Sequence, residues 1–130
     1  MKAKSATKDE AQRPPMTALI IDSNPFFGNA LRRFLADPGR IVILATSAED
    51  AIAKTREHKP SIVLLNNELE DASSLELIPE ILLENPESSV FLLASSPSIA
   101  EAVQAIKQGA TDYVEGPLQP ELLKQIIANA

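Results

Sequence analysis

The sequence predicts an α/β fold in which a parallel sheet of five strands is covered by helices on both faces. From residue 17 onward, short apolar runs alternate along the chain with longer segments of helical period. The runs are almost uniformly apolar, as expected of strands that are buried on both faces. They cover residues 18–21, 41–45, 62–65, 90–94 and 113–114.

The segments between these runs carry helix start and stop signals. The first helix is expected over residues 27–35, because apolar residues recur at helical spacing before the Asp-Pro-Gly of residues 37–39. Ser47 is a candidate N-cap for a second helix, which should end at the Lys-Pro of residues 59–60. Ser98 and Glu101 fit a capping box for the fourth helix, and Gly109 fits its end.

The third and fifth helices are marked less directly. Ser73 and Glu76 suggest a capping box, but Pro79 would then lie inside the third helix and remove a hydrogen bond. We therefore expect that helix to begin near Leu77, after a long loop over residues 66–76. Pro120 suits the first position of the fifth helix. Its buried stripe would consist of Leu122, Leu123, Ile126 and Ile127.

Composition restricts the class of protein. A chain of 130 residues fits one domain, expected over residues 17–130 behind a disordered tail at residues 1–16. A net charge of -6 argues against nucleic-acid binding, and no apolar run is long enough to cross a membrane. The tail lacks the apolar core of a secretory signal, so a cytoplasmic protein is expected. The partner that these features favour is another protein.

Several segments together resemble the receiver domain of two-component response regulators. They are IIDSNP at residues 20–25, SIVLLN at 61–66 and AVQAIKQGATDYVEGPL at 102–118, and the last is most similar to receivers of nitrogen-regulation-type transcriptional activators. The resemblance covers residue 17 to the end. It implies a flavodoxin-like, doubly wound (βα)5 fold with strand order 2-1-3-4-5 and a functional crevice at the C-terminal ends of the strands.

The resemblance also assigns the positions of the phosphorylation site. In receivers, two acids and an acceptor aspartate hold Mg²⁺ while the aspartate attacks the phosphoryl group, assisted by a hydroxyl and a lysine. Here Asp22 keeps the first acid, but Ser23, Asn66, Ala94 and Gly116 stand at the other four positions. An amide oxygen is a poor nucleophile, and one carboxylate rarely secures Mg²⁺. We expect a degenerate site with no cofactor and weak or absent Mg²⁺ binding.

Two alternatives stay open for the polar residues of this site. Asn66, taken alone, also fits a strand-end residue bonded to the backbone, and Asp22 fits either a residual cation ligand or a carboxylate bonded to backbone amides. The acidic residues Glu68, Glu70 and Asp71 are a candidate calcium loop, but they lack the regular EF-hand spacing and are interpreted as solvated loop charge. Arg32, Arg33, Arg40 and Lys54 are interpreted as charges that face solvent.

Receivers use the face of the fourth helix, fifth strand and fifth helix for output or dimerisation. In this chain that face would include Ile99, Tyr113 and Pro117, although Ile99 also fits a core position, and the sequence leaves the two open. Receivers swing the aromatic residue toward the conserved hydroxyl. With Ala94 at the hydroxyl position, we expect Tyr113 to stay in one rotamer.

The prediction is therefore a receiver-like domain, not an enzyme, that acts through phosphorylation-independent contact with a protein partner or a second copy. One alternative is an atypical phosphoacceptor that uses a displaced residue, such as Ser95 or Glu68. Another is a small-ligand module of the flavodoxin-like group. The loop after the first strand offers little of the Ser/Thr/Gly-rich cradle that such a ligand needs.

Overall fold

The computed structural model describes residues 16–115, 121, 124 and 125. Five parallel strands form one sheet in the order β2-β1-β3-β4-β5, so the predicted order is confirmed. The strands are β1 (Met16–Ile21), β2 (Arg40–Ala45), β3 (Ile62–Asn66), β4 (Ser89–Ala94) and β5 (Asp112–Glu115). The helices are α2 (Pro25–Leu35), α3 (Ala48–His58), α4 (Ser74–Glu84) and α5 (Ile99–Gln108).

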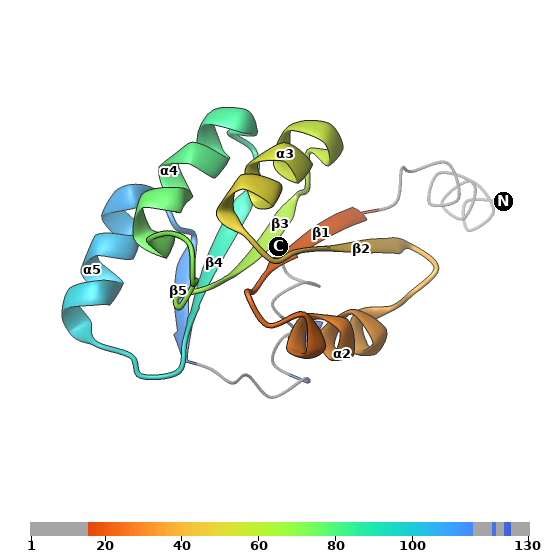
Figure 1. Ribbon diagram of the computed structural model, residues 1–130, viewed down its shortest axis with the longest axis horizontal. Helices are drawn as coiled ribbons and strands as arrows, with labels where there is room; N and C mark the ends of the chain where they lie inside the picture. The colour runs from red at the N-terminus through yellow and green to blue at the C-terminus, as the bar shows by residue number, and fades with distance from the viewer. Residues whose placement is uncertain (1–15, 116–120, 122–123, 126–130) are drawn as a thin grey trace, which may run out of the picture.

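Among the described helices, α3, α4 and α5 cover one face of the sheet and α2 lies on the other (Figure 1). Successive residues of a strand point to opposite faces, so each central strand supplies side chains to two separate cores. Leu19 and Ile21 of β1 pack in the cluster with α3, α4 and α5, whereas Ala18 and Ile20 pack in the cluster with α2. This explains why the strand segments are apolar without alternation.

The caps of two helices agree with the sequence prediction. The hydroxyl of Ser47 accepts the N–H of Asp50 at the start of α3, and the hydroxyl of Ser98 accepts the N–H of Glu101 at the start of α5. Gly109 ends α5 with a φ of 112°, where a Cβ would lie 2.6 Å from Cδ1 of Leu82. Both the backbone conformation and the neighbouring leucine therefore require glycine.

The expected start of the third helix near Leu77 is wrong. The helix α4 begins at Ser74, with Ser73 as its N-cap, and Pro79 lies inside it. The ring of Pro79 removes one backbone donor, but the cap and the burial of this helix outweigh that loss. Residues 67–73 form the loop, which is shorter than expected. Three apolar side chains of α4 are fully buried: Leu77, Ile78 and Ile81.

Some predictions fall on residues that are not described. They include the tail before Met16, the stripe of the fifth helix, and the site positions Gly116 and Pro117. Strand β1 begins at Met16, one residue before the expected domain boundary. Within the described part of the chain, no helix is long and apolar enough to cross a membrane.

Candidate functional site at the strand ends and α5

The ends of β1 and β3 bring Asp22 and Asn66 together. These strands pair in parallel with Ile21 opposite Leu65, so the residue after each pair lies at the same edge of the sheet. Nδ2 of Asn66 donates a hydrogen bond of 3.1 Å to Oδ2 of Asp22. The sequence-predicted acceptor position and the remaining acid are thus direct partners.

The other carboxylate oxygen of Asp22 is also occupied. Oδ1 accepts the backbone N–H of Asn24 at 2.9 Å, and Asp22 is only 7% exposed. This is the contact expected of a carboxylate that stabilises the turn into α2. Both oxygens of this buried acid therefore have partners within the protein.

Asn66 is held at three atoms. Its side-chain Oδ1 accepts the N–H of Glu68 at 2.7 Å, while its Nδ2 donates to Asp22. Its backbone oxygen accepts the hydroxyl of Ser74 at 2.6 Å. The amide is thereby fixed between β1 and the loop before α4, so the strand-end interpretation and the pairing with Asp22 describe one arrangement.

Ser23 and Asp71 fasten the loop after β3 to its neighbours. The hydroxyl of Ser23 accepts the N–H of Glu70 at 3.0 Å. Asp71 accepts the N–H of Ala48 at 2.9 Å, at the positive end of α3. Asp71, Glu68 and Glu70 are all exposed, as expected of solvated loop charge, and Asp71 in addition accepts a helix N–H. No group of three or more potential metal-ligating side chains occurs in the part of the chain that the structure describes.

The end of β4 offers a methyl group where the resemblance implies a hydroxyl. Ala94 is fully buried and pairs with Glu115 of β5. Its neighbour Ser95 is exposed.

Tyr113 is bound to the first turn of α5. Its hydroxyl donates to Oε1 of Glu101 at 2.6 Å and accepts the N–H of Ser98 at 3.1 Å. Burial is the main cause that raises the pKa of Tyr113 above its ordinary value, and the hydrogen bond to Glu101 raises it further, against the opposing effect of the Ser98 N–H. These contacts fix the phenol in the observed conformer, and the expectation that Tyr113 keeps one rotamer stays a prediction.

Asn67 is a site residue that the sequence analysis did not identify. Its Nδ2 donates to the same Oε1 of Glu101 at 3.0 Å, which joins the loop after β3 to α5. The sequence pattern indicates Glu101 only as the acidic member of a capping box. Periodicity cannot predict that a strand-end amide, a helix carboxylate and a strand tyrosine will meet.

The outer side of α5 is apolar and exposed. Ile99, Val103 and Ile106 are 85%, 46% and 52% exposed, at a spacing that places them along one side of the helix. Ile99 therefore lies on the surface, which resolves the two alternatives left open for it. Single exposed apolar residues are common, but three in line on one helix form a patch that suits contact with a protein.

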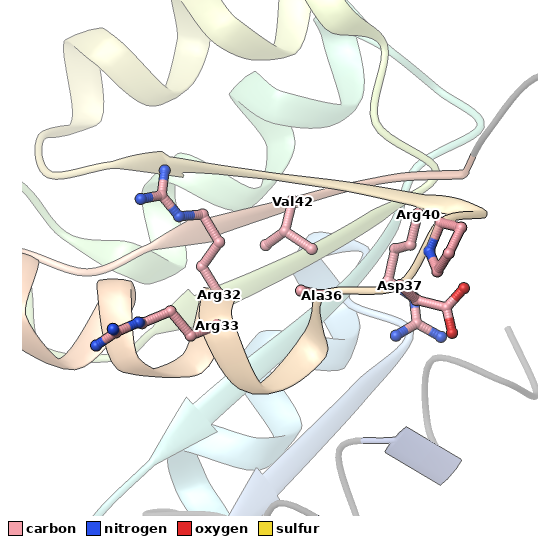
Figure 2. Close-up of a pocket in the computed structure, with 7 residues that line it drawn as sticks. Arg32, Arg33, Ala36, Asp37, Arg40 and Val42 are labelled. Carbon is pink, nitrogen blue, oxygen red and sulfur yellow. The ribbon is translucent and has the colours of Figure 1, made fainter.

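A separate hollow lies at the opposite end of β2, beside the C-terminal end of α2. It has a volume of about 620 Å³, and its lining includes Arg32, Arg33 and Arg40. Figure 2 shows the guanidinium of Arg40 on the other side of Ala36 from those of Arg32 and Arg33, so the three charges do not converge on one point. This arrangement does not make a built anion site.

The interpretation of Arg40 and Lys54 as charges that face solvent is wrong, because both side chains are partly buried. Nη1 of Arg40 donates to the backbone oxygen of Leu35 at 2.8 Å, at the end of α2. Lys54 is partly buried, donates to the backbone oxygen of Leu44 and pairs with Asp50 at 2.8 Å. Both cations satisfy carbonyl groups at the ends of secondary-structure elements.

Comparison with known proteins agrees with this geometry. The family described as Response regulator receiver domain matches residues 18–128. The chain belongs to this family. The receiver is 32% identical over 114 residues to the nitrogen assimilation regulatory protein NtrX of Azorhizobium caulinodans, which covers 86% of this chain. It spans 25% of the length of NtrX and 47% of another curated relative, the probable transcriptional regulatory protein TcrX of Mycobacterium tuberculosis.

Solved receivers share the architecture. A response regulator from Burkholderia pseudomallei, described with a phosphorylated aspartic acid and a calcium ion, has a TM-score of 0.79 and 28% identity, over 88% of this chain and 72% of that one. The beryllofluoride-activated NtrC4 receiver domain dimer has a TM-score of 0.79 and 25% identity, over 87% of this chain and 93% of that one. This chain therefore has the receiver fold and belongs to the receiver domains of two-component response regulators.

Proposed function

We propose that this receiver accepts no phosphoryl group and acts through phosphorylation-independent contact with protein. The observation that carries the proposal is the closed pair of Asp22 and Asn66. The carboxylate of Asp22 is bonded to the amide of Asn66 and to a backbone N–H, and the amide oxygen of Asn66 is bonded to the N–H of Glu68. The groups at the strand ends satisfy one another.

The same groups are poorly suited to Mg²⁺. Magnesium requires near-ideal octahedral oxygen ligands and gives up its water reluctantly. Asn66 and Ser23 are neutral, so Asp22 is the one anion among the three acid positions that the resemblance assigns. A bound cation would also have to displace the Asn24 or Asn66 hydrogen bond from Asp22. With one carboxylate in place of three, this site would not hold the ion that neutralises a transferring phosphoryl group.

Incubation with Mg²⁺ and acetyl phosphate tests this directly. We expect the intact mass of the protein to stay unchanged, while a receiver that retains its acceptor aspartate gains a phosphoryl group in parallel. An adduct on this chain would overturn the proposal. Ser95→Ala and Glu68→Gln would then identify a displaced acceptor, because loss of the adduct in either variant locates the labelled residue.

The exposed stripe on α5 is the proposed docking surface, and a second copy of this chain is its proposed occupant. Ile99, Val103 and Ile106 are exposed along one side of the helix. A two-fold pairing would place this stripe against itself, as a symmetric dimer requires. The similarity to a receiver solved as a dimer supports the choice of a second copy.

Sedimentation velocity over a range of concentrations tests the dimer. We expect reversible association without Mg²⁺ or phosphodonor, and its loss in an Ile99→Asp/Ile106→Asp double variant. Phe26→Asp serves as the matched control, since Phe26 is as exposed as Ile99 but lies on α2, across the sheet. A protein that remains monomeric at all concentrations, or association that the α5 variant leaves intact, would contradict a second copy as the occupant.

A further inference from the structure

The start of α5 departs from an ordinary capping box. In that motif the N-cap hydroxyl accepts the N–H of the third helical residue, whose carboxylate reaches back to the N-cap N–H. The first half is present, because Ser98 Oγ accepts the N–H of Glu101 at 3.1 Å. In place of the second half, the N–H of Ser98 bonds to the hydroxyl of Tyr113, which donates to Glu101. A tyrosine from β5 is thus inserted into the cap of α5.

Glu101 is the centre of this contact. Its Oε1 accepts two donors, the hydroxyl of Tyr113 at 2.6 Å and Nδ2 of Asn67 at 3.0 Å. Asn67 is in turn held by its backbone N–H, which bonds to the oxygen of Leu93 at 2.8 Å. Hydrogen bonds to a carboxylate are stronger than those between neutral groups. One carboxylate therefore joins β5, α5 and the loop after β3.

We infer that Glu101 is a latch that holds Tyr113 in the cap of α5, so that the α5–β5 surface is set by this network rather than by the strand-end pair. The inference rests on the proposed function only in treating this surface as the docking surface. The contacts that form the latch involve neither Asp22 nor Asn66.

The latch has a second arrangement within reach. If Tyr113 withdraws, the N–H of Ser98 loses its partner, and the carboxylate of Glu101 is then free to close the ordinary capping box with that N–H. The released state therefore keeps a satisfied helix terminus. A protein that binds the side chain of Tyr113 therefore has to replace only the hydrogen bonds that the phenol makes to Ser98 and Glu101. Release of Tyr113 changes the hydrogen bonding at the start of α5, next to Ile99.

Tyr113 can be observed alone, because the chain has one tyrosine and no tryptophan. Intrinsic emission and tyrosinate absorbance of the whole protein therefore report on this residue. We compare wild type with Glu101→Gln, which keeps the shape and removes the charge. The matched control is Glu76→Gln, at the same third position of α4 after its own serine cap.

We expect Glu101→Gln to raise the tyrosine emission, since a carboxylate that accepts the phenol proton quenches it. The midpoint of tyrosinate formation should fall toward the ordinary value, because the Glu101 bond is one of the causes that raise the pKa of Tyr113. Glu76→Gln should leave both signals at their wild-type values. Wild-type emission and midpoint in a folded Glu101→Gln protein would overturn the latch.

A second variant tests the latch if Glu101→Gln does not fold. Tyr113→Phe removes the hydroxyl that accepts the Ser98 N–H, so this N–H should pass to the carboxylate of Glu101 and its proton resonance should move downfield, while Asp50, whose N–H is capped by Ser47 on α3, keeps its position. An unmoved Ser98 resonance would overturn the latch. These signals need neither Mg²⁺ nor a second copy, so loss of the latch and failure of the proposed function are seen in separate experiments.

Discussion

The strand-end pair and the latch at α5 both join neighbouring elements through polar side chains, but they differ in the partners that they bind. Asp22 and Asn66 bond to each other and to N–H groups two residues further along the chain. Glu101 instead collects side-chain donors from β5 and from the loop after β3. The strand-end pair thus joins two neighbouring strands and otherwise satisfies backbone groups close in the chain, whereas the single carboxylate of Glu101 joins side chains from two other elements to α5.

The largest expected effect is at the strand ends. Asp22→Ala leaves the amide of Asn66 and the N–H of Asn24 without their acceptor, and should lower the free energy of unfolding by about 1–3 kcal/mol. Urea unfolding measures it. Asp37→Ala is the control, because Asp37 also accepts an N–H two residues ahead but is exposed. Equal losses in the two variants would mean that the pair with Asn66 contributes nothing.

Tyr113→Phe should have a smaller effect, because it removes one hydroxyl and leaves the ring in place. We expect a loss of about 0.5–1.5 kcal/mol near neutral pH. Since the pKa of Tyr113 is raised in the folded state, its stabilising effect is complete below the ordinary value near 10 and is lost as the pH rises through the folded pKa. The difference between wild type and Tyr113→Phe should therefore shrink in alkaline urea titrations. A difference that grows with pH would contradict the assigned contacts.

The smallest effect is expected at an ion pair outside both regions. Two hydrogen bonds from Arg56 to Glu84 are the main cause that lowers the pKa of Glu84, and they link α3 to α4. A carboxyl group whose pKa is lowered in the folded state stabilises the fold when the pH is above its ordinary, unfolded-state pKa. This stabilisation is lost as the pH falls through the folded-state pKa. Arg56→Ala should thus reduce the stability slightly at pH 7 and low salt, and not in acid or at high salt. A salt-independent loss would indicate that packing of the arginine stem, not its charge, matters.

The sequence predicted the fold because its signals are local. Uniform apolar runs identified the strands, and Ser47, Ser98 and Gly109 marked helix ends through contacts within one turn. The start of α4 was predicted wrongly because Pro79 disfavours a helix interior, whereas the serine cap at Ser73 marks the observed start. Ser74 is buried and its hydroxyl bonds to the backbone oxygen of Asn66, a contact that depends on the assembled sheet and favours the longer helix.

The site was predicted in part, for the same physical reason. The parallel order of β1 and β3 predicts that Asp22 and Asn66 lie at one edge of the sheet. Nothing in the sequence predicts that Asn67 and Tyr113 share one oxygen of Glu101, because those contacts depend on the positions of three elements that are distant in the chain.

The most direct test of the central claim is an amide NMR titration of the full chain with Mg²⁺, followed by beryllofluoride as a phosphoryl mimic. A Ser23→Asp/Asn66→Asp variant, which restores two carboxylates beside Asp22, serves as the responsive reference. We predict that Asp22, Asn66, Ala94 and Tyr113 keep their positions in wild type while the reference shifts with Mg²⁺. Saturable shifts in wild type that spread from Asn66 to Tyr113 would contradict the account, because the strand ends would then bind a ligand and transmit its presence to α5.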